Sequence, residues 1–135
     1  MKHIIFFAVC LATFSAYSQE VAKKATNGPV ITWKESSYDF GDIRQGEKVE
    51  HTFVFTNTGN EPLIITNVQV TCGCTTPKGF PRDPIAPGES SEITVAFNSA
   101  GRVGKQNKVV TVVSNSVGTT NQISFTANVI RPENP

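Results

Sequence analysis

The fold is decided by residues 49–56, VEHTFVFT, which are followed at residues 57–60 by NTGN. Apolar and polar side chains alternate through the first stretch, and a period of two residues is typical of a β-strand with one buried face. We interpret residues 57–60 as a turn, because asparagine and glycine tolerate a positive φ. One face of the strand therefore meets the core, and it carries Val49, His51, Phe53 and Phe55.

Similar apolar or alternating runs occur on both sides of this stretch. We expect residues 30–33 and 37–40 to form one broken strand, and further strands at 63–70, 93–97, 109–113 and 123–129. Residues 109–113 are almost continuously apolar, which predicts a central strand covered on both faces. About seven short strands, with turns roughly every 8–12 residues, favour an all-β, immunoglobulin-like antiparallel β-sandwich. Its core would be built on Phe53, Phe55, Phe97 and Phe125.

The N-terminal segment differs in composition from the rest of the chain. Lys2 and His3 precede an apolar run from Ile4 to Phe14, and small residues follow before Gln19. This order is typical of a secretory signal peptide, and the run is shorter than the about 18 residues of a spanning helix. We therefore predict a signal peptide at 1–18, a flexible leader at 19–29 and a single domain at 30–131.

Charge argues against nucleic acid and anionic membranes as partners. Removal of residues 1–18 takes away Lys2 and leaves eleven basic against eleven acidic residues. A net charge of zero provides no long-range field toward phosphate. No later apolar run is long enough to span a bilayer. We expect an exported protein that resides in the periplasm, at the cell surface or outside the cell.

Several short motifs come in an order that resembles a known family. They are Phe40-Gly41-Asp42-Ile43, Gly46-Glu47, the stretch 53–59, Pro62-Leu63, Cys72-Gly73-Cys74-Thr75, the stretch 85–89 and Phe97-Asn98. From about Ser37 to Val129 the chain resembles the bacterial domain of unknown function DUF1573. That family is similar in turn to the immunoglobulin-like domains of major sperm protein, pilus-chaperone and cilia-associated proteins. The resemblance implies the fold and export, but no biochemical role.

Cys72-Gly73-Cys74 is the chemically unusual feature of the sequence. In an extended strand both sulfurs would lie on one face, near the upper Cα–Cα limit of about 6.8 Å for a disulfide, with Gly73 relaxing the backbone. A structural disulfide, or a pair of buried thiols, is our preferred interpretation for an exported protein. A soft-metal site for copper or zinc is a second, although His51 is the one histidine after residue 18. Thiol–disulfide exchange is a third.

The sequence contains no catalytic or cofactor motif. There is no Gly-x-Ser-x-Gly, no His-Glu-x-x-His and no phosphate-binding glycine loop. We therefore expect no enzyme and no cofactor, but a structural or protein-interaction module of the bacterial envelope. An envelope protein or peptide would bind at a sheet edge or at the loop 72–84. Phe80 would either be exposed there or plug the end of the core. The candidate loop residues are Thr75, Lys78, Phe80 and Arg82.

Overall fold

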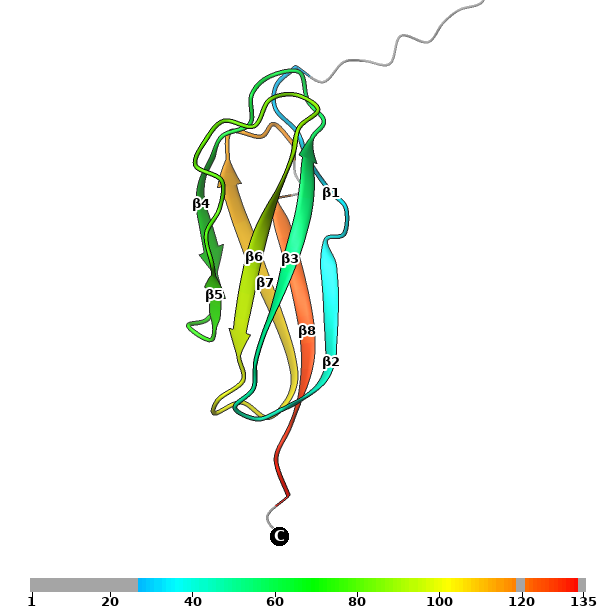
Figure 1. Cartoon of the computed structure of the whole chain (residues 1–135), viewed down its shortest axis with the longest axis vertical. Helices are drawn as coiled ribbons and strands as arrows, with labels where there is room; N and C mark the ends of the chain where they lie inside the picture. The colour runs from blue at the N-terminus through cyan, green and yellow to red at the C-terminus, as the bar shows by residue number, and fades with distance from the viewer. Residues whose placement is uncertain (1–26, 119–120, 134–135) are drawn as a thin grey trace, which may run out of the picture.

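The computed structural model describes residues 27–118 and 121–133, and the chain forms a sandwich of two sheets (Figure 1). The signal peptide predicted at 1–18, and the leader as far as residue 26, lie outside the described residues. In strand order, sheet A consists of β1 (Ile31–Trp33), β3 (Lys48–Asn57), β6 (Ser90–Asn98) and β5 (Thr75–Pro77). Sheet B consists of β2 (Ser37–Arg44), β8 (Gln122–Ile130), β7 (Gly104–Ser114) and β4 (Ile65–Val70).

The all-β sandwich predicted from the sequence is confirmed, and the described residues form eight strands rather than about seven. The predicted broken strand is two strands in different sheets, since residues 34–36 carry the chain from sheet A to sheet B. β5 is the other addition, within the segment expected to be a loop. All pairings are antiparallel except that of β2 with β8, which is parallel.

The core lies between the sheets and is built on four phenylalanines. Phe53, Phe55, Phe97 and Phe125 are at most 1% exposed, as the alternating pattern predicts. Phe97 of sheet A and Phe125 of sheet B place their ring centroids 5.5 Å apart, so aromatic packing joins the two layers. Burial of each such side chain contributes on the order of 2–3 kcal/mol.

Strand β7 differs from the prediction for residues 109–113. Val110 and Val112 are buried, whereas Val113 is 36% exposed and Val109 is half-buried. The prediction of two covered faces is therefore wrong, because no third layer of described residues covers the outer face of sheet B. Valine occupies the wet face because β-branched side chains suit the pleated backbone.

Asn57 ties one end of the sandwich together. Its buried side chain accepts hydrogen bonds from the backbone N–H groups of Val30 and Gly59, at 3.2 and 3.0 Å. It donates to the carbonyls of Glu61 and Ile85, at 2.8 and 2.9 Å. One amide thus connects the start of β1, the turn after β3 and the loop before β6.

The turn at residues 57–60 does not use a positive φ, contrary to the prediction. Gly59 is required instead by close packing, because a Cβ there would overlap the backbone of Gly28 and Pro29. Gly28 and Pro29 are themselves buried against this turn. These two residues, at the end of the predicted leader, therefore pack against the sandwich.

Candidate functional site around the Cys72–Cys74 disulfide

Cys72 and Cys74 lie in a tight turn between β4 and β5, where the chain passes from sheet B to sheet A. A disulfide joins them across Gly73, and their Cα atoms are 5.4 Å apart. The prediction placed them on an extended strand, near the limit of about 6.8 Å. The turn brings them closer, within the usual range for a bridge.

Three short contacts surround the two sulfurs. The backbone N–H of Cys74 donates to Cys72 Sγ at 3.3 Å. The hydroxyl of Thr75 lies 3.9 Å from the sulfur of each cysteine. A disulfide sulfur carries no proton, so the hydroxyl is the donor, and its single proton is shared between the two contacts. The two sulfurs therefore differ, because Cys72 Sγ also accepts the backbone hydrogen bond.

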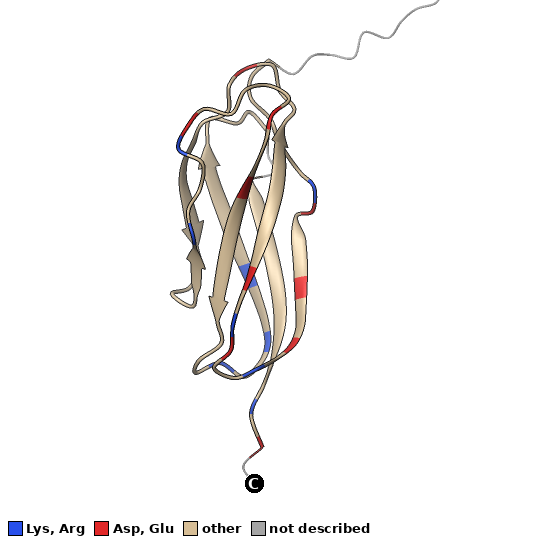
Figure 2. Cartoon of the chain, in the orientation of Figure 1, with Lys and Arg blue, Asp and Glu red and all other residues tan. Residues whose placement is uncertain are grey.

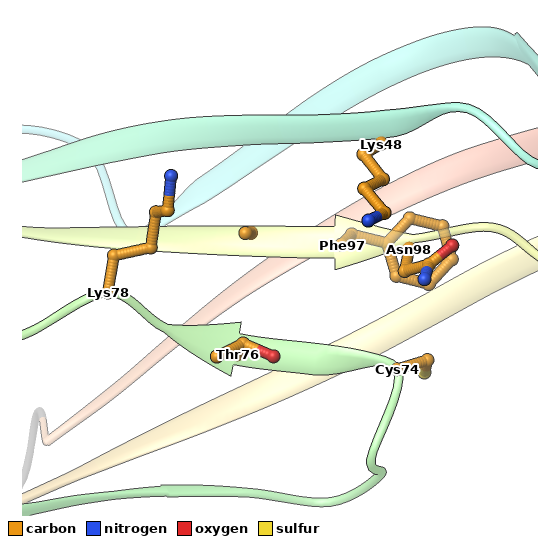
Figure 3. A pocket seen from close by; sticks show the side chains of 7 residues that line it. Lys48, Cys74, Thr76, Lys78, Phe97 and Asn98 are labelled. Atoms are coloured by element: carbon orange, nitrogen blue, oxygen red, sulfur yellow. The ribbon is translucent and has the colours of Figure 1, made fainter.

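Cys74 borders a hollow on the outer surface of sheet A (Figure 3). The hollow has a volume of about 230 Å³ and is bounded by parts of three adjacent strands. The registers place Thr76 of β5 and Glu50 of β3 on either side of Ala96 of β6. Alanine leaves open the space that a larger side chain would fill. The hollow is lined by Lys48, Cys74, Thr76, Lys78, Ala96, Phe97 and Asn98.

Two lysines flank the hollow, and their side chains extend toward β6 from the neighbouring strands (Figure 3). Lys78 Nζ forms an ion pair of 2.8 Å with Glu50, and both side chains are more than half exposed. Lys48 forms no ion pair with any residue that the structure describes. Acidic and basic residues are otherwise interspersed over the sandwich (Figure 2). Lys48 is therefore the cation available to a ligand in the hollow.

The predicted loop residues do not form one surface. Lys78 borders the hollow, but Thr75 is only 3% exposed and points its hydroxyl at the sulfurs. The Thr75 side chain faces inward from β5 and is buried. Phe80 is partly buried against the core, and the Arg82 guanidinium lies 4.2 Å above its ring.

His51 has structural partners, as its place at the core edge predicts. Its Nε2 contacts the carboxylate of Glu35, and its ring stacks on Tyr38 with centroids 3.6 Å apart. The rings of Phe40 and Phe53 meet it edge-on. Among the described residues, no cluster of three or more His, Cys, Asp or Glu side chains is arranged to hold a metal ion. The disulfide also occupies both sulfurs that a soft-metal site would use.

Asp39 lies at a bulge in β2, where the register with β8 shifts. The backbone N–H of Gly41, which has a φ of 70°, donates to its carboxylate at 2.9 Å. This hydrogen bond, a second one from Thr126 and the charge of Lys105 lower the pKa of Asp39. The carboxylate is exposed, so this arrangement shapes the edge of sheet B and has no sign of an acid–base role.

Sequence reasoning missed Lys48, Ala96 and Asn98 as neighbours of the cysteines. Lys48 and Asn98 are paired in the β3–β6 register, and β5 joins β6 beside them. These pairings are non-local, and the sequence around each residue carries no sign of them. The one local sign was Cys74 itself, within the Cys-Gly-Cys motif.

Two sheets of this topology around an aromatic core define an all-β, immunoglobulin-like sandwich. Residues 31–129 match the model of the family described as "Protein of unknown function (DUF1573)", and the chain belongs to that family. The resemblance noted in the sequence is therefore confirmed. The description of the family names no catalytic activity. No curated protein matches the chain.

Solved structures show the same fold at low sequence identity. A protein of unknown function from Porphyromonas gingivalis is 20% identical with a TM-score of 0.63, covering 82% of this chain and 51% of its own. PapD-like domain 7 of human CEP192 is 12% identical with a TM-score of 0.58, covering 86% and 97%. The SrpA adhesin of Streptococcus sanguinis is 11% identical with a TM-score of 0.53, covering 81% and 60%. The chain thus spans about half the length of the Porphyromonas protein.

Proposed function

We propose that the protein is an exported, non-catalytic interaction module of the bacterial envelope, and that it binds a partner protein or peptide at the hollow beside Cys74. The observation that carries the proposal is this hollow of about 230 Å³, which has at its border a disulfide and a lysine, Lys48, that forms no ion pair with another described residue. Its size suits one or two partner side chains. Binding sites of sandwich domains are commonly built from such loops and strand ends.

Strand addition at the adjoining sheet edge is a poorer mechanism. Cys74 and Lys78 both bond to β6, so backbone alternation directs Thr75 and Pro77 away from it. The N–H of Thr75 is already bonded to the Cys72 carbonyl at 3.2 Å, and proline has no N–H. The free edge of β5 therefore offers no donor to a new strand. We infer that a partner contacts side chains in the hollow.

Lys48 determines the chemistry of the partner. A lysine without an ion pair at the border of a hollow favours a carboxylate or another hydrogen-bond acceptor. Thr76 and Asn98 add side chains that donate and accept hydrogen bonds. The proposed ligand is therefore an acidic segment of an envelope protein or peptide.

Export rests on the N-terminal pattern at residues 1–18 and on the disulfide. Disulfides persist in oxidising compartments and are rare in the cytosol. Among the described residues no helix has the length and apolar character needed to cross a membrane. A periplasmic, surface or extracellular location fits these observations. Sequencing the N-terminus of protein recovered from cell fractions tests this part of the proposal, and an intact N-terminus in the cytosol contradicts it.

Site-specific photo-cross-linking in the living cell tests the binding site. A photoreactive amino acid replaces Thr76, which is exposed in the hollow, or Asn107, which is exposed on β7 of the other sheet. We expect a discrete adduct at position 76 and none at position 107. Lys48→Glu should abolish the adduct, whereas Lys108→Glu, a charge reversal on β7, should leave it intact. Equal labelling at both positions, or an adduct indifferent to Lys48→Glu, contradicts the proposal.

A further inference from the structure

The Cys72–Cys74 disulfide contributes little to folding because it closes a very small loop. A cross-link stabilises a protein mainly by restricting the unfolded chain, and the effect grows with loop length. The two cysteines are separated by two positions in the sequence. For a loop of three residues the chain-entropy relation gives about 1.6 kcal/mol, against about 3 kcal/mol for a loop of 15 residues. Global stability therefore does not explain why a disulfide lies at this position.

The environment of the bond distinguishes a leaving sulfur from an attacked one. Cys72 Sγ accepts the N–H of Cys74 at 3.3 Å, and a hydrogen bond of this kind stabilises negative charge on sulfur. The buried hydroxyl of Thr75 lies 3.9 Å from both sulfurs, so the backbone hydrogen bond is the contact that distinguishes Cys72 Sγ. Cys72 is thus prepared to leave as a thiolate when the bond breaks.

Of the two cysteines, Cys74 is the one that borders the hollow and that an incoming group can reach. It borders the hollow together with Lys48 and Lys78 (Figure 3), and because Lys78 is paired with Glu50, Lys48 is the cation that attracts an anionic nucleophile. Thiolates, rather than thiols, attack disulfides. The hollow therefore gives a partner thiolate access to Cys74. Cys72 does not line the hollow, and its sulfur is the leaving group.

We propose that Cys72–Cys74 is a thiol–disulfide exchange site that accepts two electrons from a dithiol segment of a protein or peptide bound in the hollow. A partner thiolate attacks Cys74 Sγ and forms a mixed disulfide. The bond to Cys72 breaks, and its electron pair goes to Cys72 Sγ, which takes a proton from water. The second partner thiolate then attacks the partner sulfur of the mixed disulfide, and Cys74 leaves as a thiolate that is protonated in turn.

The reaction balances. The partner dithiol loses two electrons and two protons and becomes a disulfide, while Cys72 and Cys74 gain both and become thiols. The inference adds an activity to the proposed binding site, and it is tested with a small thiol that needs no protein partner. A negative glutathione result would overturn the exchange activity but not the binding site that cross-linking tests. A negative cross-linking result would overturn the binding site but not the exchange activity toward a small thiol.

The test maps the mixed disulfide that forms with reduced glutathione. The native protein is mixed with glutathione, quenched early by alkylation, and digested for mass spectrometry, with any adduct at Cys10 counted separately. We expect glutathione on Cys74 and the alkyl group on Cys72, in roughly tenfold excess over the reverse, the ratio expected from one hydrogen bond to a charged group. An equal distribution, an excess on Cys72 or no adduct without denaturant overturns the proposal.

Thr75→Val gives a second measurement, with Thr66→Val as its matched control. Both changes remove a threonine hydroxyl at nearly constant volume, but Thr66 is exposed on β4, outside the lining of the hollow, and its hydroxyl donates to the Val113 carbonyl at 3.2 Å. The Thr75 hydroxyl lies 3.9 Å from both sulfurs and stabilises whichever one leaves. We therefore expect the mixed disulfide to form several-fold more slowly in Thr75→Val, with the excess on Cys74 unchanged, and both quantities to be unchanged in Thr66→Val. Circular dichroism confirms that each variant is folded. Loss of the excess on Cys74 in Thr75→Val would contradict the role given to the backbone hydrogen bond to Cys72 Sγ.

Discussion

Replacing Asn57 with alanine removes the one side chain that joins three segments at the end of the sandwich. The amide is 0% exposed and makes four hydrogen bonds, all to backbone groups. Alanine supplies none of them, and a small cavity replaces the amide. The effect should therefore be large for a residue in a turn, because ordinary surface substitutions stay within about 0.5 kcal/mol.

The magnitude follows from the fate of each partner. The Ile85 carbonyl also accepts the N–H of Leu63 at 2.8 Å, so it keeps one hydrogen bond. The other three partners are partly buried, and each loses its hydrogen bond to the amide. They are the N–H groups of Val30 and Gly59 and the carbonyl of Glu61. At about 1 kcal/mol each, the free energy of unfolding should fall by about 3 kcal/mol. For a domain of this size the midpoint of thermal unfolding should fall by roughly 12–24 °C.

Urea and thermal unfolding, followed by circular dichroism, measure this difference. Asn115→Ala is the matched control, because its amide also bonds to two backbone groups, Ile64 N–H and the Pro62 carbonyl, but is exposed. We expect the control to lose less than about 1 kcal/mol, since water replaces the lost hydrogen bonds. An Asn57→Ala protein as stable as the control would refute the reasoning.

Three further predictions follow from the packing and charges described above. Gly59→Ala should lower the free energy of unfolding by about 3 kcal/mol, which is the upper end of the usual cost of overpacking. The reason is that the new Cβ would overlap backbone atoms, which cannot move aside as a flexible side chain can. Thermal unfolding measures the loss. Replacing both Cys72 and Cys74 with serine should cost no more than about 1.6 kcal/mol in urea. The hydrogen bond from the backbone N–H of Gly41 lowers the pKa of Asp39. The ionised carboxylate therefore stabilises the fold above its usual pKa of 3.8, and this stabilisation is lost as pH falls through the lower pKa of the folded state. Unfolding of wild type and Asp39→Asn, compared over about pH 2 to 6, measures the effect across the range in which a carboxylate titrates.

Each of these predictions has a control and a contrary result. Gly73→Ala, where a Cβ meets nothing within 4 Å, should leave the stability nearly unchanged, and equal losses at Gly59 and Gly73 would contradict the packing argument. A double serine variant that fails to fold would show that the disulfide is a structural requirement. If Asp39→Asn keeps the same pH dependence as wild type, the lowered pKa of Asp39 does not contribute to acid unfolding.

Local patterns in the sequence were sufficient for the sandwich and its aromatic core. The alternation through Phe53 and Phe55 depends on the two-residue period of a strand, which acts over a few residues. The misassigned segments lacked such a local sign. Thr75–Pro77 is too short for a period to appear, and it becomes a strand because β6 lies beside it.

The candidate site could be predicted only in part. Cys72 and Cys74 are adjacent enough in sequence for their pairing to be anticipated, but the turn that shortens their separation is set by the crossing from sheet B to sheet A. The hollow depends on Lys48 and Ala96 meeting β5 through strand register. Gly59 shows the same limit, because its need for close approach arises from Gly28, which is distant in sequence.

The central claim is that the fold carries a disulfide that is accessible and that folding does not require. The most direct test counts free thiols while the native protein is reduced and follows the fold by circular dichroism. Reduction without denaturant should release two additional thiols, at Cys72 and Cys74, while the β-sheet spectrum stays unchanged. Thiols that appear only when the domain unfolds, or a spectrum that collapses as they appear, would contradict the account.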